Sequence, residues 1–331
     1  MSRISEPAER SGAVARVDGD AEQPRRQSVD IIVVGGGPAG MTAALYALRN
    51  GKSALVIEKA GFGGQITHSP KVENYPGTLS ASGNEIADGM FDQIMAQGAD
   101  IEVETVCEIR DEGGIKRVLT EEGTEHEGRA VVIATGVKHR MLGLPGEEDL
   151  VGEGISFCAV CDGDFYAGQT VAVAGGGNSA LQEAILLAEK CREVIILQDL
   201  PQLTGETKLQ EVLLARPNVR VVCNTRLTGL VTDGGEFAGV DYEDRATGET
   251  HRVACDGLFV AIGLIPENKP FEALADLNDW GYFDSDERCC TRTPGVYVAG
   301  DCRSKGVRQL TTAVADGATA ALAACRYING L

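Results

Sequence analysis

Two cysteines stand three positions apart in the segment Cys158-Ala159-Val160-Cys161-Asp162-Gly163. Thiols at this spacing can close a small disulfide ring, and one of the two usually has a depressed pKa. The carboxyl group of Asp162, directly behind them, can deliver or remove the proton that thiol exchange requires. The segment therefore indicates thiol–disulfide redox chemistry.

Two other interpretations of the cysteine pair stay open from the residues alone. A zinc site needs further ligands, but the chain has no second pair at this spacing, and its four histidines lie at no ligand spacing beside the first pair. A purely structural disulfide gains little from so short a loop and is easily reduced inside a cell. We predict a redox role for the pair, no metal site, and reduced core thiols for most of the other cysteines.

A glycine-rich turn lies near the start of the chain, between an apolar strand and a helix. The order is a strand over residues 29–34, the turn Gly35-Gly36-Gly37-Pro38-Ala39-Gly40, a helix over 41–49 and a strand over 55–58. Gly35 permits the tight turn, Gly37 lets the backbone approach a pyrophosphate, and Gly40 lets the helix pack closely on the strand. Glu58 ends the second strand, where a carboxylate can accept hydrogen bonds from ribose hydroxyls. This unit predicts a dinucleotide site.

The same pattern occurs again after the cysteine pair. It comprises a strand over residues 170–174, the turn Gly175-Gly176-Gly177-Asn178-Ser179-Ala180, a helix over 181–189 and a strand over 194–197. Gln198 follows Gly175 by the same 23 positions that separate Glu58 from Gly35. One chain therefore carries two nucleotide-binding units of the Rossmann type.

The remaining segments place the second unit inside the first. Short alternating strands over 219–223, 227–232, 238–242 and 251–254 predict a β-meander, and further buried strands are expected over 130–136, 257–263 and 295–301, with a final helix over 310–328. We predict an α/β, three-layer ββα fold with a first domain from 29–140 plus 268–331, an inserted domain from 141–267, hinges near 139–143 and 264–269, and a disordered polar tail over 1–28.

Composition limits the partners. The 331 residues carry a net charge of −19, and 43% of them are hydrophobic. A strongly negative field disfavours nucleic acid and anionic membranes. The chain has no apolar run long enough to span a bilayer and no apolar stretch at its start, so we predict a cytoplasmic protein with neither membrane nor nucleic-acid partners.

The ordered motifs resemble the low-molecular-weight thioredoxin reductases, flavoproteins with two dinucleotide-binding domains. The resemblance covers about residues 29–328. It rests on both glycine-rich turns, the cysteine pair with Asp162, and the segments Gly63-Gly64-Gln65, Val72-Glu73-Asn74-Tyr75-Pro76-Gly77, Ala134-Thr135-Gly136, Ala261-Ile262-Gly263 with Pro266, Gly300-Asp301 and Arg308-Gln309.

The resemblance implies that the first domain binds FAD. The implied contacts come from the first turn, from the end of its second strand, and from four later segments: Gly35, Gly37, Pro38, Ala39, Gly40, Glu58, Gly64, Gln65, Asn74, Thr135, Gly136, Gly300, Asp301, Arg308, Gln309 and Leu310. The residues support part of this independently, because Asp301 follows a buried strand and ligands of α/β sheets collect at the carboxyl ends of strands. Arg308 and Gln309 precede the last helix, whose positive end suits the electron-rich edge of a reduced flavin.

The resemblance also implies roles in catalysis. Cys161 would face the flavin, Cys158 would attack the disulfide of thioredoxin, and Asp162 would handle the proton. The inserted domain would swing about the two hinges to present the thiols alternately to flavin and partner. Members of the family are usually homodimers.

The chain departs from the family after the second strand of the second unit. Most members hold the 2′-phosphate of NADPH there with a His-Arg-Arg cluster, but this chain reads Gln198-Asp199-Leu200 and has no arginine between 198 and 215. A phosphate without paired cations binds poorly beside Asp199 and Glu206, so NADPH is the least favoured donor.

Two donors stay open. Asp199 can accept from a free ribose hydroxyl and select NADH. Alternatively the second unit has lost its nucleotide, and reduced ferredoxin supplies electrons as in the ferredoxin-dependent flavin thioredoxin reductases. An acidic ferredoxin needs a local basic patch on which to dock. Five basic residues either form such a patch or are only solvated surface charges: Arg288, Arg292, Arg303, Lys305 and Arg308.

Two further functions compete. A flavin-dependent dithiol oxidase would run the same parts backwards, using oxygen to form disulfides in small molecules, and such relatives also lack the phosphate-binding arginines. A flavin-bound redox sensor would do no catalysis. The pair with Asp162 fits the reductases better than it fits either alternative.

Overall fold

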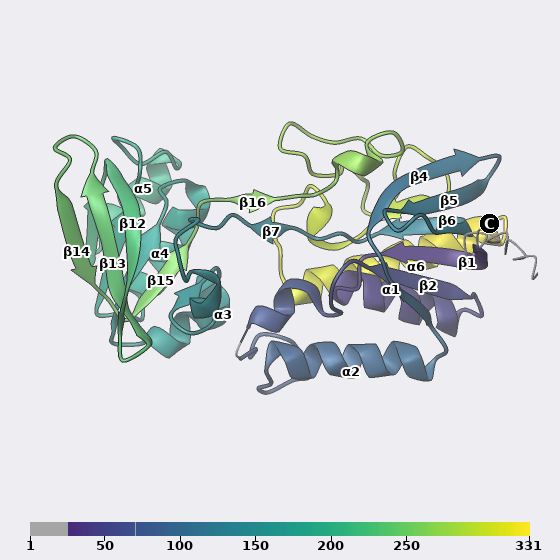
Figure 1. Cartoon of the computed structure of the whole chain (residues 1–331), viewed down its shortest axis with the longest axis horizontal. Coiled ribbons are helices and arrows are strands. Elements are labelled where there is room, and N and C mark those ends of the chain that lie inside the picture. The colour runs from purple at the N-terminus through teal and green to yellow at the C-terminus, as the bar shows by residue number, and fades with distance from the viewer. Residues whose placement is uncertain (1–25, 70) are drawn as a thin grey trace, which may run out of the picture.

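The computed structural model describes residues 26–69 and 71–331 and shows two lobes joined by two extended segments (Figure 1). The tail predicted over residues 1–28 lies mostly outside the described residues. Its last three positions are a correction: the first strand, β1, runs over Arg26–Val34, and the backbone of its first residues pairs with β6.

The first lobe is built on a seven-stranded sheet. Its parallel part has the order β3-β2-β1-β6-β17, and β4 and β5 add an antiparallel extension on β6. Helices α1, α2 and α6 lie on one side of the parallel strands (Figure 1). The bounds are β2 Ala54–Glu58, β3 Asp100–Val103, β4 Val106–Glu112, β5 Ile115–Thr120, β6 Glu125–Ile133, β17 Val296–Val298, α1 Pro38–Arg49, α2 Gly83–Ala96 and α6 Leu310–Ile328.

Strand β1 explains why both faces of this sheet are covered. Ile31 and Val33 point into the core beneath the helices, whereas Ile32 and Val34 point into a second core beneath β4, β5 and a loop segment. A strand buried on both faces reads as a continuous apolar run, which is how this segment appears in the sequence. The lobe therefore has the three layers expected of a ββα fold.

Helices α1 and α6 approach each other closely. A Cβ atom on Gly317 of α6 would lie 2.1 Å from the carbonyl oxygen of Ala39 on α1, so only glycine fits there. Alanines fill the rest of the contact on both helices. This contact, which we call the α1–α6 seam, joins the first glycine-rich turn to the helix that begins at Leu310.

The second lobe has a five-stranded parallel sheet of order β11-β10-β9-β15-β8. Helices α3, α4 and α5 accompany it, and an antiparallel sheet of β12, β13 and β14 covers its other face. The meander predicted from residue 219 is wrong in its first member, because β11 is a parallel neighbour of β10. The bounds are β8 Ile155–Ser156, β9 Thr170–Ala174, β10 Glu193–Leu197, β11 Val219–Val222, β12 Thr225–Asp233, β13 Glu236–Asp244, β14 Thr250–Ala254, β15 Gly257–Val260, α3 Ala159–Asp162, α4 Asn178–Ala188 and α5 Thr207–Leu214.

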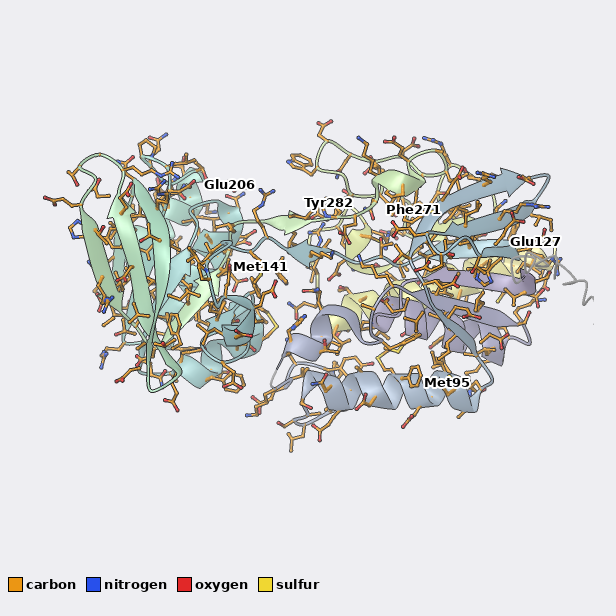
Figure 2. The ribbon with its side chains drawn as sticks, viewed as in Figure 1. Met95, Glu127, Met141, Glu206, Phe271 and Tyr282 are labelled. Atoms are coloured by element: carbon orange, nitrogen blue, oxygen red, sulfur yellow. A yellow bond between two sulfur atoms is a disulfide. The ribbon has the colours of Figure 1, made fainter. Side chains whose placement is uncertain are left out.

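Two short strands connect the lobes. The chain leaves the first lobe through β7, Lys138–His139, and returns through β16, Leu264–Ile265, which pairs with β7 in antiparallel fashion. The second Rossmann-like domain is therefore inserted into the first. Figure 2 shows Glu206 in the inserted lobe and Phe271 and Tyr282 in the first. Short 3-10 turns are η1 Gly64–His68, η2 Glu148–Leu150, η3 Gly163–Tyr166, η4 Lys269–Phe271 and η5 Gly300–Cys302.

Within residues 26–69 and 71–331, no helix has the length and apolar character needed to cross a membrane. The same part of the chain holds no cluster of three or more potential metal ligands.

Candidate functional site: a cofactor cavity that contains the cysteine pair

A cavity of about 1080 Å³ lies between the carboxyl ends of the first lobe's strands and the inserted lobe. Of the residues that the resemblance implies for FAD contact, all except Gly40 line it. Both cysteines of the pair line it as well. The structure thus brings together segments that lie more than 200 positions apart in the sequence.

The glycines of the two turns have matching surroundings. Gly35 has a φ of +109°, and a Cβ atom there would lie 2.4 Å from the carbonyl oxygen of Ala134. Gly175 has a φ of +122°, and its Cβ would lie 2.5 Å from the carbonyl oxygen of Ala261. Gly40 does not reach the cavity because it packs against Gly35, where a Cβ would lie 1.9 Å from an oxygen. Only glycine permits these approaches.

Glu58 is fixed at the end of β2. Its Oε2 accepts from the amide of Gly36 at 2.6 Å, and its Oε1 accepts from the amide of Ala60 at 3.1 Å. These bonds hold the carboxylate at the rim of the cavity, beside the first turn. A carboxylate in this place can accept from the ribose hydroxyls of an adenosine.

Asp301 follows β17 in the turn η5. Lys305 Nζ lies 3.4 Å from Asp301 Oδ1, yet this buried oxygen accepts no hydrogen bond from the described residues. Burial raises the pKa of Asp301, against the opposing effect of Lys305 and Arg308. A buried carboxylate oxygen whose ion-pair partner lies 3.4 Å away can accept a further hydrogen bond, and at the wall of a cavity it fits the hydroxyl groups of a bound FAD.

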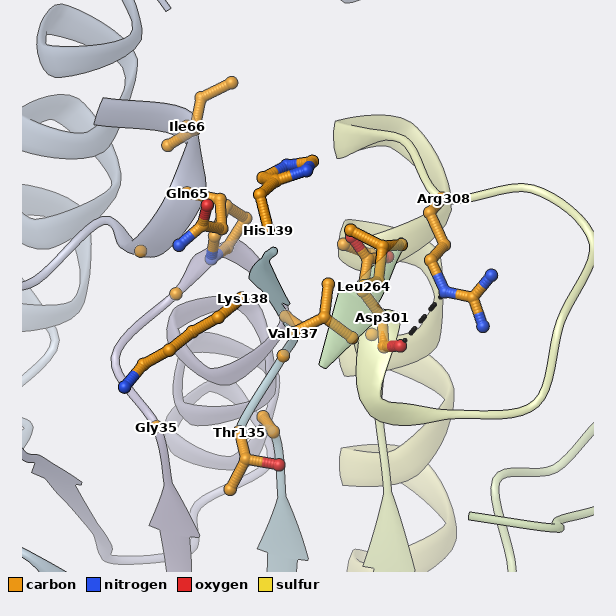
Figure 3. Close-up of a pocket in the computed structure, with 18 of the residues that line it drawn as sticks. Gly35, Gln65, Ile66, Thr135, Val137, Lys138, His139, Leu264, Asp301 and Arg308 are labelled. Carbon is orange, nitrogen blue, oxygen red and sulfur yellow. Dashed lines mark hydrogen bonds between the residues drawn. The ribbon is translucent and has the colours of Figure 1, made fainter. Parts of the chain in front are cut away.

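The loop before α6 completes the cavity. Gln309 is the N-cap of α6, and its Oε1 accepts from Asn74 Nδ2 at 3.1 Å. The guanidinium group of Arg308 lies 4.1 Å from the centre of the Tyr282 ring and donates to the carbonyl oxygen of Asp301. Figure 3 shows Gln65 and Ile66 on one side of the cavity and Asp301 and Arg308 on the other.

Cys158 and Cys161 form a disulfide with their Cα atoms 5.3 Å apart. Cys158 is the N-cap of the short helix α3, and its sulfur accepts from the amide of Cys161 at 3.1 Å. Amide donors at a helix N-terminus stabilise a thiolate, so the position favours ionisation of Cys158 in the reduced protein.

Asp162 directly follows Cys161 and is the last residue of α3. Its Oδ2 accepts from the hydroxyl of Ser156 at 2.6 Å, and its Oδ1 is buried without a hydrogen-bond partner among the described residues. Burial raises the pKa of Asp162, and the bond from Ser156 opposes that rise. Ser156 also accepts from the amide of Cys158 at 3.1 Å, so one hydroxyl connects the acid to the cysteine turn.

His139, at the end of β7, stacks on Phe157 with ring centres 4.4 Å apart. Burial, together with the nearby His68, lowers the pKa of His139 to about 4. Both histidines line the cavity. From the sequence, His139 was expected only at a hinge, and Ser156 and Phe157 were not expected at the site, since single residues of these types carry no spacing signal.

The second glycine-rich turn is held by the loop that follows β10. The amide of Glu206 donates to Asn178 Oδ1 at 2.7 Å, and Asn178 Nδ2 donates back to Glu206 Oε1 at 3.1 Å. Gln198, in the place that corresponds to Glu58, is buried and donates from Nε2 to the carbonyl oxygen of Gln202. Ser179 is the member of this turn that lines the cavity.

The predicted basic patch is wrong. Four of its five members pair with acids: Arg288 with Asp286, Arg292 with Asp276, and both Arg303 and Lys305 with Asp316. Arg303 is also buried. The fifth, Arg308, stacks on Tyr282. Asp286 lies only two positions before Arg288, whereas Asp276 and Asp316 lie outside the basic segment, so the clustering of bases along the chain was misleading.

Comparison with known proteins agrees with this site. Residues 29–317 match the family model described as pyridine nucleotide-disulphide oxidoreductase. The chain is 37% identical to the thioredoxin reductase of Bacillus subtilis over 91% of its own length and 95% of that protein.

Two solved structures are also similar. The thioredoxin reductase of Streptococcus pyogenes is 36% identical, superposes with a TM-score of 0.87, and the match covers 92% of this chain and 99% of that one. The Lactococcus lactis thioredoxin reductase in its "FR conformation" is 34% identical with a TM-score of 0.64, and the match covers 92% of this chain and 100% of that one. The chain therefore belongs to the pyridine nucleotide-disulphide oxidoreductases, and within them to the thioredoxin reductases, which are FAD-dependent disulfide oxidoreductases.

Proposed function

We propose that this protein reduces the disulfide of thioredoxin, or of a similar small redox protein, through Cys158 and Cys161. The observation that carries the proposal is the shared cavity: the disulfide and the predicted FAD contacts line the same space. A disulfide that lines a flavin cavity has a route for electrons that a purely structural disulfide does not need.

A bound FAD that has been reduced by the electron donor would supply the electron pair that the disulfide takes up. The Cys158–Cys161 bond breaks, and the two sulfurs take up two protons in total, for which Asp162, the acid that follows Cys161 in the chain, is the proposed donor. The Cys158 thiolate then attacks the partner's disulfide and forms a mixed disulfide while one partner sulfur leaves. Cys161 attacks Cys158, closes the original bond and releases the second partner sulfur, so two thiol protons end on the partner.

We further propose that the inserted lobe changes its orientation during the cycle. In the arrangement described, the disulfide lines the cofactor cavity and is poorly placed for a protein partner. The two solved relatives are similarly identical and similarly covered, yet their TM-scores differ, 0.87 against 0.64. A difference in lobe orientation accounts for such a contrast, and β7 and β16 are the segments that would bend.

For the electron donor, we propose NADH or reduced ferredoxin rather than NADPH. The pairing of Arg292, Arg303 and Lys305 with acids favours NADH of the two, because an acidic ferredoxin needs unpaired cations to dock on. The loop from Gln198 to Glu206 holds no cation and carries two carboxylates, those of Asp199 and Glu206. Glu206 is hydrogen-bonded to Asn178, the first residue of α4, where a dinucleotide of this fold type places its phosphates. Both features oppose a ligand with an extra phosphate.

We also propose a cytoplasmic homodimer. The cytoplasm suits the eight cysteines that remain free thiols, because a reducing compartment keeps them so. The dimer follows from the resemblance to the family, and light scattering of the purified protein tests it.

Anaerobic titration of the purified flavoprotein tests the main proposal. NADPH, NADH and reduced ferredoxin are each mixed with the protein, and flavin absorbance is followed before and after oxidised thioredoxin is added. We expect bleaching by NADH or ferredoxin and recovery on addition of thioredoxin. Rapid bleaching by NADPH would overturn the donor assignment, and reoxidation by oxygen with a small dithiol, but not by thioredoxin, would identify a dithiol oxidase.

Two variants sharpen this experiment. Cys158→Ser should remove thioredoxin reduction, and a parental rate in this variant would refute the assigned nucleophile. The double variant Asp199→Arg with Leu200→Arg replaces an acid by cations after β10. If the parent uses NADPH poorly because these cations are missing, NADPH should bleach the flavin of the double variant at least about tenfold faster than the flavin of the parent. One charge-assisted phosphate contact is worth about 1.5–3 kcal/mol.

A further inference from the structure

A second carboxyl group faces the cysteine pair from helix α4. Glu183 lines the cavity together with Cys158 and Cys161. Its Oε2 accepts a hydrogen bond from the amide of Ala159, the residue that directly follows Cys158 and begins α3. Cys158 and Glu183 are therefore separated by a single peptide group.

The surroundings of Glu183 are poor in positive charge. Burial raises its pKa to about 7, with Asp162 adding to the rise and the Ala159 amide opposing it. Asp162 lies on α3, and burial with Asp162 raises the pKa of Tyr166, which follows it in η3, to about 12. His68 and His139 also line the cavity, and His139 stacks on Phe157, the residue before Cys158. Glu183 thus changes charge close to neutral pH beside the sulfur that must ionise.

We propose that Glu183 is a positioning residue that governs thiolate formation at Cys158 through the charge it places on the Ala159 amide. An ionised Glu183 accepts the hydrogen bond from that amide and places a negative charge beside the sulfur of Cys158, which disfavours the thiolate. A protonated Glu183 removes the charge. Loss of the proton from Cys158 to solvent and gain of a proton by Glu183 from solvent therefore favour each other, and the net charge of the pair is unchanged.

This inference deepens the proposed function, because it concerns the sulfur that would attack the partner. In that reaction the Cys158 thiolate is consumed when the mixed disulfide forms. Glu183 can then ionise again and renew its bond to Ala159, which returns the cysteine turn to the arrangement found with the closed disulfide.

The test measures the ionisation of Cys158 directly. FAD-loaded protein with Cys161→Ser, so that Cys158 cannot re-form the disulfide, is reduced with dithiothreitol and freed of reductant. It is then briefly alkylated with iodoacetamide between pH 5 and 9, and mass spectrometry counts the label on the Cys158 peptide. Glu183→Gln keeps an oxygen that can accept from Ala159 but removes the charge. We expect the pH midpoint of Cys158 labelling in Glu183→Gln to fall by about half a unit to one unit, which is about three- to tenfold more thiolate at pH values below the midpoint.

A second variant distinguishes the charge of Glu183 from its structural support of the cysteine turn. If Glu183 only supports the turn, Glu183→Gln should match the parent and Glu183→Ala should differ. If the charge of Glu183 governs the ionisation of Cys158, the pH midpoint of labelling should be lower in both variants than in the parent. Glu189→Gln is the matched control, since Glu189 ends the same helix and pairs with Arg216. Coincident profiles for the parent and Glu183→Gln would overturn the inference. Because no electron donor or thioredoxin is used, such a result would leave the proposed reductase activity to its own test.

Discussion

At the scale of residues, the cavity contains polar groups whose hydrogen-bonding capacity the chain itself does not use. Asp301 has a buried carboxylate oxygen that accepts no hydrogen bond from the described residues, while Glu58 at the other end uses both of its oxygens on backbone amides. Leaving a buried acceptor unmatched costs stability. The expected compensation is a hydroxyl group of the cofactor.

Replacement of Asp301 tests that expectation. Asp301→Ala should weaken FAD binding about 10- to 100-fold, since a hydrogen bond to a charged group contributes about 1.5–3 kcal/mol. Measurement is by the flavin content of the purified protein and by titration of the apoprotein with FAD. Asp284→Ala, an exposed change in a neighbouring loop, serves as the control. Equal FAD affinity in Asp301→Ala and the parent would contradict the assignment.

At the scale of elements, the connecting strands do more than join the lobes. β7 places His139 against Phe157, the residue before Cys158, and so joins the connection to the cysteine turn. Lys138 on the same strand and Lys59 after β2 both pair with Glu267, which follows β16. Contacts on both strands thus support the orientation in which the disulfide faces the cofactor cavity.

The lowered pKa of His139 predicts a pH dependence of stability. Between its ordinary value of 6.5 and about 4, the unfolded chain binds a proton that the folded chain does not, so stability falls as the pH drops through this range. His139→Phe keeps a ring for the stack but cannot titrate. Relative to the parent, its free energy of unfolding should rise by at most about 3 kcal/mol between pH 7 and pH 4. Urea unfolding at fixed FAD concentration measures this, and a difference that is constant with pH would refute it.

The elements also show where sequence reasoning works. Both Rossmann-like units were predictable, because a strand, a glycine turn and an apolar-periodic helix must follow one another for the backbone to meet a pyrophosphate. β11 was misassigned because a segment as short as Val219–Val222, apolar except for Arg220, fits a meander or a parallel strand equally well. The two-residue strands β7 and β16 carry too little pattern to be found.

The residues of the site also divide into those that the sequence identifies and those that it does not. Cys158, Cys161 and Asp162 were identified because their spacing is itself the signal. Glu183 was not, since an acid inside an amphipathic helix reads as a solvated surface residue. Its role depends on the approach of α4 to α3, which only the tertiary fold provides.

At the scale of the whole molecule, few contacts join the lobes apart from the connecting strands. The ammonium group of Lys71, in the first lobe, lies 5.5 Å from the centre of the Phe165 ring in η3 of the second. Such an interaction is worth about 0.5–1 kcal/mol at an exposed site. That is small enough for the lobes to separate during a catalytic cycle.

Removal of this contact should shift the proposed equilibrium between lobe orientations. Lys71→Met keeps the aliphatic stem and removes the charge, and we expect the population facing the cavity to fall about two- to fivefold relative to the alternative. Small-angle X-ray scattering of the oxidised, FAD-loaded protein reports the change in shape. Lys208→Met, on α5 of the inserted lobe, is the control. An unchanged scattering curve for Lys71→Met would argue that Lys71 does not hold the lobes together.

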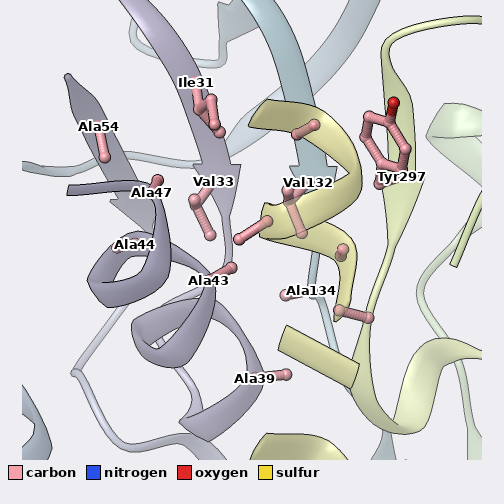
Figure 4. Packing of buried hydrophobic residues seen from close by; sticks show 14 of the residues in the cluster. Ile31, Val33, Ala39, Ala43, Ala44, Ala47, Ala54, Val132, Ala134 and Tyr297 are labelled. Atoms are coloured by element: carbon pink, nitrogen blue, oxygen red, sulfur yellow. The ribbon is translucent and has the colours of Figure 1, made fainter. Parts of the chain in front are cut away.

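The α1–α6 seam has a consequence for synthesis of the chain. Figure 4 shows Ala39, Ala43 and Ala47 on α1 beside the helix α6. The first turn of the cofactor cavity leaves the ribosome early, but its opposite wall and the helix that packs on it follow only after residue 300. The inserted lobe, made in between, has its own sheet and can fold while the first lobe still waits for its final helix. FAD can therefore be captured only at the end of translation, after the cysteine-bearing lobe has already formed.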